Sequence, residues 1–152
     1  MDRFLEIFKS SEHRWIVWTL LATGIALSIA ISTGYIRIID VLFHVFIEIK
    51  FWKLLLLTST YILLLNVIFD LKLNPLLIDL CFLLSKSLIK ALYAFAGFSV
   101  ALLLTNLIFG YMNHAAFFTI TGFTTYFVAL ATHWIVLDLE SQSRDLCIET
   151  YC

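Results

Sequence analysis

The chain has 152 residues, of which 62% are hydrophobic and 14% are charged; its net charge is −1 and its mean hydropathy is +0.98. Soluble domains are about 45–50% apolar and about 25% charged, so this composition excludes an ordinary soluble domain and predicts a membrane protein. The small net charge gives no reason to expect nucleic acid as a partner, and the three cysteines make no disulfide framework.

The apolar segments predict helices rather than strands. A membrane β-barrel alternates polar and apolar residues in segments of roughly 10 residues, whereas Leu55–Leu57 and Leu63–Leu65 are unbroken apolar runs. We therefore predict an all-α integral membrane protein with one membrane domain, built as a bundle of four transmembrane helices. The predicted spans cover about residues 15–33, 51–69, 89–111 and 115–137.

Residues 1–14 carry six charged side chains around Phe4, Leu5, Ile7 and Phe8. This pattern is typical of a short amphipathic helix that lies at the membrane interface. The first predicted span follows directly.

The first span is expected to end at Gly34. Polar side chains then follow at i, i+3, i+7 and i+11, which places them on one stripe of an otherwise apolar helix. They are Arg37, Asp40, His44 and Glu48. We expect an amphipathic extension over residues 36–49, in front of the second span.

Asn74 and Pro75 predict a helix start, with asparagine as the N-cap and proline at the first helical position. No residue demands a break before about Met112. Such a helix would be roughly 57 Å long at about 1.5 Å per residue, whereas the hydrocarbon core of a membrane is about 30 Å thick. We expect residues 75–88 to form a second amphipathic extension, which either projects from the membrane or lies on it, and residues 89–111 to cross.

The turn at residues 111–114 predicts that the third and fourth spans are antiparallel neighbours, and a polar tail covers residues 138–152. Lys and Arg number seven in the two terminal segments and the second loop, and three in the first and third loops. Because positive charge marks the cytoplasmic side, we expect both termini in the cytoplasm. The expected location is a bacterial inner (plasma) membrane.

The fourth predicted span carries a small and hydroxylated face, whose members fall within roughly 140° of one another on a helical wheel. They are Thr119, Gly122, Thr125, Tyr126, Ala129, Thr132 and His133. One interpretation is helix packing, since small residues let backbones approach closely. The other is a narrow hydrated path between symmetry copies, with His133 as a proton or ion site near its cytoplasmic mouth.

The third predicted span has a matching small face, formed by Ala91, Ala94, Gly97, Ala101 and Thr105. The first span adds Ala22, Ala26 and Ala30 at four-residue spacing. These packing faces exceed what one four-helix bundle needs, so we expect the protein to form a homo-oligomer.

Asn66 and Asn106 lie deep in the second and third predicted spans, where an unsatisfied amide is costly. We expect the two amides to bond each other or the threonines of the fourth span. A substrate or ion site is the alternative.

The sequence contains no H-E-x-x-H zinc motif, no G-x-S-x-G nucleophile elbow and no glycine-rich phosphate loop. Its acidic residues lie at helix ends and on interfacial stripes instead of in pairs within the spans. None of the four histidines lies well inside a span, as bis-histidine haem ligation in a bundle requires. We therefore expect no enzymatic activity, no metal site and no cofactor.

These features favour a small membrane anchor or sensor subunit that docks and regulates a cytosolic protein, for example in a bacterial defence or secretion module. The residues predicted to dock the partner are Lys72, Lys86, Lys90, Asp138, Glu140 and Asp145. Two other functions stay open. One is an oligomeric ion channel or pore lined by the Thr/Gly/Ala face of the fourth span, and the other is an immunity protein against a membrane-active toxin.

Overall fold

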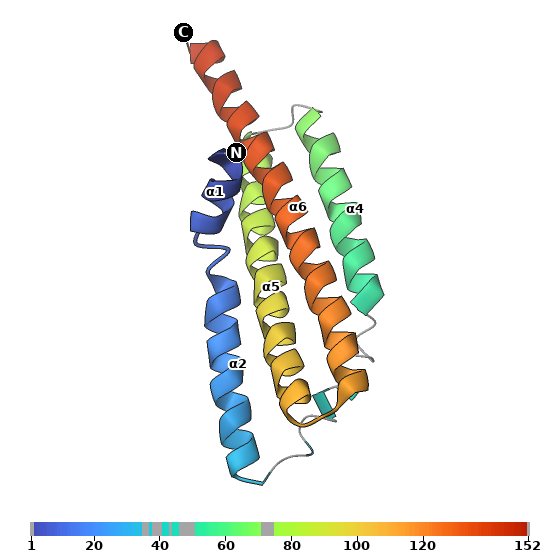
Figure 1. The fold of residues 1–152 in the computed structure, drawn as a ribbon. Helices are drawn as coiled ribbons and strands as arrows, with labels where there is room; N and C mark the ends of the chain where they lie inside the picture. The colour runs from blue at the N-terminus through green and yellow to red at the C-terminus, as the bar shows by residue number, and fades with distance from the viewer. Residues whose placement is uncertain are drawn as a thin grey trace.

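The helices of the protein are shown in Figure 1, a computed structural model that describes residues 2–34, 37, 41–42, 44–45, 51–70 and 75–151. Within these residues there is no strand, and the expected all-α fold is confirmed. The five helices of the described residues are α1 (Asp2–Lys9), α2 (Trp15–Ser32), α4 (Phe51–Asp70), α5 (Pro75–Ile108) and α6 (Met112–Tyr151).

Three of the helices are long and apolar enough to cross a membrane. Their apolar stretches are Trp15–Ser32 in α2, Ile78–Ile108 in α5 and Met112–Gln142 in α6. Helix α4 has 20 residues and contains a shorter apolar stretch, Leu56–Leu65. The chain is therefore an integral membrane protein with three helices of spanning length.

Helices α5 and α6 are much longer than a membrane is thick. Their 34 and 40 residues correspond to roughly 51 and 60 Å at about 1.5 Å per residue. The extension expected over residues 75–88 is the first part of α5, and the tail expected after residue 137 continues α6 as far as Tyr151. Pro75, at the predicted start of α5, is the one proline of the chain, so no proline interrupts the hydrogen-bond ladder of either helix.

Glycines in the left-handed region end α2 and α5. Gly34 follows α2 with φ 85°, and Gly110 follows α5 with φ 78°, a conformation that glycine adopts without strain. After α5, the N–H of Tyr111 donates to the carbonyl oxygen of Asn106 (2.9 Å), and that of Gly110 donates to Leu107 (3.3 Å). This pair of bonds is a Schellman motif. The turn lies slightly earlier than the predicted residues 111–114, because α6 already begins at Met112.

The central pair of the bundle is α5 and α6, which run antiparallel (Figure 1). Helix α2 packs along α5, and α4 lies on the other side of the pair, in contact with both α6 and α5. The four long helices alternate in direction along the chain, and α1 lies near the end of the bundle at which both termini are found (Figure 1).

The buried apolar residues form two clusters along the central pair. The cluster nearer the termini joins α4, α5 and α6 and contains Leu65, Ile89, Leu92, Tyr93, Ala129, Val136 and Leu139. The other joins α2, α5 and α6 through Leu27, Leu102 and Phe118. Leu27 is the buried residue of α2, and Trp18 and Ile25 on its outer face are 67% and 61% exposed.

The amphipathic extension expected over residues 36–49 lies largely outside the described residues. Residues 41–42 and 44–45, which are described, are helical, and Leu42 packs against the second cluster. The predicted stripe of Arg37, Asp40, His44 and Glu48 stays a prediction.

Candidate functional site

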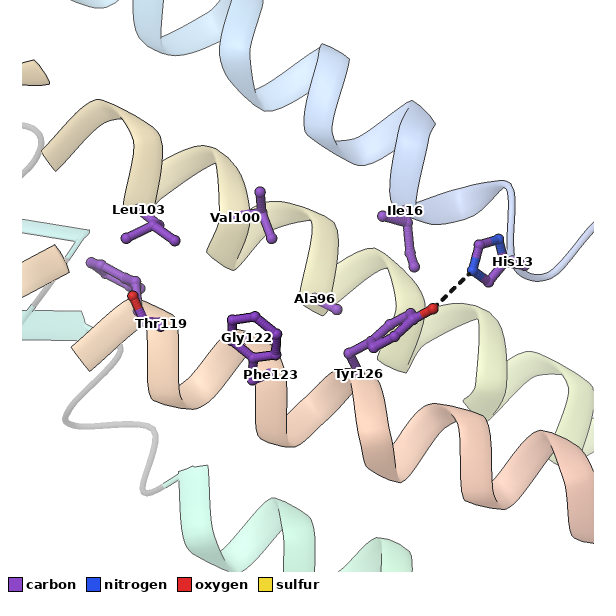
Figure 2. A pocket seen from close by; sticks show the side chains of 10 residues that line it. His13, Ile16, Ala96, Val100, Leu103, Thr119, Gly122, Phe123 and Tyr126 are labelled. Atoms are coloured by element: carbon purple, nitrogen blue, oxygen red, sulfur yellow. Dashed lines mark hydrogen bonds between the residues drawn. The ribbon is translucent and has the colours of Figure 1, made fainter. Parts of the chain in front are cut away.

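Ser10 shapes the corner between α1 and α2. Its hydroxyl donates a hydrogen bond to the carbonyl oxygen of Ile7 (2.6 Å) and accepts one from the backbone N–H of His13 (3.2 Å). Ile7 is 1% exposed, and α1 contacts α6. The corner is therefore held by the bundle and by the two hydrogen bonds of the Ser10 hydroxyl, and it directs the His13 side chain toward α6 (Figure 2).

The His13 imidazole packs against three aromatic rings. Its centroid lies 4.9 Å from that of Phe8, 5.1 Å from Tyr93 and 6.1 Å from Tyr126, in edge-to-face geometry. Its Nε2 lies 3.4 Å from the Tyr126 hydroxyl, the bond drawn in Figure 2. Burial lowers the pKa of His13 from its ordinary value of 6.5, because desolvation disfavours the charged ring. The imidazole is therefore neutral at about pH 7 and retains one acceptor nitrogen.

A second imidazole, that of His133 on α6, lies beside the same rings. It is 5% exposed, and its Nδ1 lies 3.3 Å from the hydroxyl of the fully buried Tyr93 on α5. The Tyr93 and Tyr126 ring centroids are 6.2 Å apart. We call His13, Tyr93, Tyr126 and His133 the imidazole–tyrosine cluster. It joins the α1–α2 corner to both central helices.

Sequence reasoning placed Tyr126 and His133 on one face of α6 but missed His13 and Tyr93. Tyr93 lies one turn before Gly97, on a face that was recognised only by its small residues. A tyrosine on the small-residue face of one span and a histidine just outside another are the signals that could have identified the cluster.

A charged pocket of about 340 Å³ lies beside the cluster, between α1, α5 and α6. Lys86 Nζ is 3.0 Å from Glu140 Oε1, and Lys90 Nζ is 3.9 Å from Glu12 Oε1. These side chains are partly exposed, so each pair contributes no more than about 1 kcal/mol. The pairs tie α5 to α6 and to the α1–α2 corner. The ionisable residues that line the pocket are Glu6, Lys9, Glu12, Lys86, His133 and Glu140.

A second cavity, the apolar groove, has a volume of about 290 Å³ and lies between α2, α5 and α6 (Figure 2). Its apolar lining includes Ile16, Val100, Leu103, Phe118 and Phe123. His13 and Tyr126 line the groove at one end, near the start of α2 (Figure 2). Because His133 lines the charged pocket, the imidazole–tyrosine cluster lies between the two cavities.

The predicted face of α6 is directed mainly at α5. Thr125, Ala129, Thr132 and His133 are at most 5% exposed. A Cβ at Gly122 would lie 3.2 Å from the Cβ of Ser99 on α5. The remaining members, Thr119 and Tyr126, are half-buried and line the apolar groove.

The threonine hydroxyls of this face bond within α6. Each donates to the carbonyl oxygen four residues earlier: Thr119 to Ala115, Thr125 to Thr121 and Thr132 to Val128. These bonds satisfy the hydrogen-bond donors of the threonine hydroxyls within an otherwise apolar helix contact.

The small face of α5 contacts α2 at Gly97. A Cβ at this position would overlap the hydroxyl oxygen of Thr19 and the carbonyl oxygen of Ile16, so only glycine permits the observed distance between the two helices. Ala94, Ala101 and Thr105 of the same face are buried or half-buried, whereas Ala91 is exposed.

Asn106 is fully buried in α5. Its Nδ2 donates to the carbonyl oxygen of Leu102 (2.7 Å), and its Oδ1 has no hydrogen-bond partner among the described residues. The amide therefore bonds its own helix. The side chain of Asn66 lies outside the described residues, so the expected bond between the two amides stays a prediction.

Three residues predicted to dock a partner form ion pairs inside the chain: Lys86, Lys90 and Glu140. Asp138 accepts a hydrogen bond from Nε2 of Gln142 (3.2 Å). Lys72 and the side chain of Asp145 lie outside the described residues.

Among the described residues, no three His, Cys, Asp or Glu side chains are grouped so that they could hold a metal ion. The chain matches no protein-family model, no curated protein and no solved structure. What is proposed of its function therefore rests on the geometry of the molecule itself.

Proposed function

We propose that this protein is a homo-oligomeric membrane anchor or sensor subunit that docks and regulates a cytosolic protein. In this proposal it crosses a bacterial inner (plasma) membrane four times, with both termini in the cytoplasm. The observation that carries the proposal is the end of the bundle where the termini lie (Figure 1). Charged side chains gather there, and α6 continues past the Lys86–Glu140 pair as far as Tyr151. We call residues 138–151 the stalk, and its end extends beyond the other helices in Figure 1.

The ion pairs support a membrane boundary at this end. Glu12 beside Lys90 and Glu140 beside Lys86 form a charged layer across the α1–α2 corner, α5 and α6. From Lys90 to Ile108, α5 rises roughly 27 Å at about 1.5 Å per residue, close to the hydrocarbon thickness of about 30 Å. Helix α4, with 20 residues, has the length of one such crossing and is the fourth span of the proposal.

The stalk supports docking of a soluble protein. Its first residues pack against α5 in the charged layer, and its end extends beyond the other helices in Figure 1. Its sequence carries charges of both signs, Asp138, Glu140, Arg144, Asp145 and Glu149, between apolar residues. A helix that leaves the membrane with such a surface suits a polar docking interface.

Helix α1 supports a sensor role, because it lies next to the base of the stalk. It contacts α6, and it is joined to α2 by the corner that holds His13 against Tyr126. A shift of the corner is thereby transmitted to the part of α6 from which the stalk emerges.

The outer face of α2 supports self-association. Ala22 and Ala26 lie one turn apart on this face, and both are exposed. A second copy can approach closely along such a face. The pore alternative has less support, because Ala129 and Thr132 are fully buried within one chain. A pore lined by them would require α5 and α6 to separate.

The proposal is tested by purifying the tagged full-length protein from its host in mild detergent and analysing its partners by mass spectrometry. We expect a homo-oligomer that carries one soluble protein at a fixed ratio. Reversing the charges of the stalk (Asp145→Lys with Glu149→Lys) should release that protein, whereas Asn113→Lys at the opposite end should retain it. The proposal fails if the stalk variant keeps the soluble protein. It also fails if the wild type purifies as an oligomer alone that conducts ions in liposomes.

A further inference from the structure

The apolar groove opens outward, toward the surroundings of the bundle. Val100 and Phe123, which line it, are 37% and 60% exposed. The groove lies along the spanning stretches of α5 and α6, where these surroundings are lipid. An empty groove would deprive its lining of van der Waals contacts, so in the membrane it is filled either by a lipid chain or by part of another protein.

Its size favours a lipid chain. The groove extends from Leu103 to Ala96 along α5, roughly 10 Å at about 1.5 Å per residue, and its volume is about 290 Å³. A helix about 10 Å across would occupy roughly 800 Å³ over that length. A helix of a second copy is therefore too large for the groove, whereas a single unbranched acyl chain is narrow enough.

The groove and the charged pocket lie on either side of the imidazole–tyrosine cluster, and consecutive residues line them. His13 lines the groove and Glu12 lines the pocket, at the level of the Glu12–Lys90 ion pair. A phospholipid has the same order, with a hydrocarbon chain below and a charged headgroup above. The two cavities thus match the two parts of one amphipathic molecule.

The charges of the pocket select among headgroups. Lys9 and Lys86 offer positive charge to a phosphate, and Glu6 and Glu12 offer negative charge to an ammonium group. Glu12 and Lys86 already pair with Lys90 and Glu140, so the pocket holds charges of both signs. A zwitterionic headgroup adds no net charge to it, because its ammonium group offsets the phosphate charge that it brings near the carboxylates. Lipid tails are as apolar as the side chains that they touch, so selectivity must come from the headgroup.

We propose that the apolar groove and the charged pocket together bind one zwitterionic phospholipid. One acyl chain lies in the groove beside Val100, and the headgroup lies between Lys9, Lys86 and the carboxylates of Glu6 and Glu12. The glycerol of the lipid lies beside the His13–Tyr126 pair, between the groove and the pocket. This site does not depend on the docking of a cytosolic protein and is tested separately from it.

The test uses the full-length protein in bilayers that contain equal amounts of phosphatidylethanolamine and phosphatidylglycerol. The protein is extracted in mild detergent, and the lipid that stays bound is counted by native mass spectrometry. We expect one phosphatidylethanolamine per chain, enriched about threefold or more, the scale of one partly exposed ion pair. Equal retention of the two lipids would overturn the headgroup assignment, and the absence of retained lipid would overturn the site.

Two substitutions on adjacent turns of α5 locate the bound chain. Val100→Phe fills the groove and should abolish retention. Leu104→Phe introduces the same side chain at a 51% exposed position that does not line the groove, and it should retain the lipid. Retention by the Val100→Phe protein would refute the proposal. So would a change of oligomeric state in the same spectra, since that would show that another copy fills the groove.

A second pair covers the case in which Val100→Phe does not fold. Thr119→Phe at the far end of the groove should displace the lipid, and the neighbouring Ile120→Phe, at a 61% exposed position, should not. For the headgroup, Lys9→Glu should remove the preference for phosphatidylethanolamine, so that the ratio of the two retained lipids becomes about one, as expected for the loss of one ion pair. One lipid per chain should remain bound. Unchanged enrichment in this variant would remove the proposed role of the pocket.

Discussion

Replacing Gly97 with alanine tests the contact between α2 and α5. The new Cβ would overlap the Thr19 hydroxyl and the Ile16 carbonyl oxygen. The hydroxyl can rotate away, but the carbonyl oxygen belongs to the backbone of α2, so the whole helix has to move. Overpacking of this kind lowers the free energy of unfolding by about 1–3 kcal/mol.

Helix propensity acts in the opposite direction. Alanine is favoured over glycine in a helix interior by about 1 kcal/mol, so the net loss for Gly97→Ala is about 0–2 kcal/mol. Gly24→Ala in α2 is the matched control, because its Cβ would meet no atom within 4 Å. That variant should gain up to about 1 kcal/mol. The difference between the two variants isolates the overlap and should be about 1–3 kcal/mol.

The assay is equilibrium unfolding of each full-length variant in mixed micelles, followed by the loss of tertiary structure. Adding Thr19→Ala to Gly97→Ala should restore only part of the loss, since the Ile16 carbonyl oxygen still blocks the Cβ. If Gly97→Ala proves as stabilising as Gly24→Ala, the close approach of α2 and α5 described here is wrong.

Three further predictions concern the ion pairs, His13 and Asn106. A double-mutant cycle of Lys86→Ala and Glu140→Ala should give a coupling energy below about 1 kcal/mol that decreases with added salt. The two side chains are 42% and 26% exposed. A larger coupling energy that does not depend on salt would show that the pair is more buried than these exposures indicate. Burial lowers the pKa of His13 from 6.5, so the unfolded chain binds more protons in acid, and stability should be full above pH 6.5 and fall as the pH drops below it. The loss of stability in acid should be smaller in His13→Gln than in the wild type. The range to compare is pH 7.5 to 5.5, about one unit either side of the ordinary histidine pKa. If both proteins lose the same stability over this range, the loss comes from groups other than His13. Asn106→Leu removes a buried oxygen that has no hydrogen-bond partner in the described part of the chain, so the free energy of unfolding should stay unchanged or rise by up to about 1–3 kcal/mol. A clear decrease would reveal a partner for this amide.

Some elements of the fold were predictable because their causes are local. Pro75 marked the start of α5, and Gly34 marked the end of α2. The full length of α6 was missed, since its residues after position 137 are polar and were taken for a tail. In the structure they continue the helix, because neither glycine nor proline follows Gly122 in the chain to interrupt it.

The candidate site was predictable only in part. The repeat of small residues identified the faces that hold Gly97 and Gly122, because close backbone approach requires small side chains. It did not identify their partners, which are α2 for Gly97 and α5 for Gly122. Lys86 and Lys90 were predicted to face a partner protein, and the structure places both beside carboxylates of the same chain.

The amino-acid sequence alone was enough to predict that this protein is helical and belongs in a membrane. Apolar runs of spanning length must satisfy their backbone groups internally in lipid, and the helix does so within one segment. Only the tertiary structure brought His13 to Tyr126, 113 residues further along the chain, and so placed a polar cluster between a groove and a pocket. The physical reason is that lipid and protein interior are equally apolar. Hydrophobicity therefore shows which segments enter the membrane but not which faces meet there, and shape, small residues and hydrogen bonds decide that.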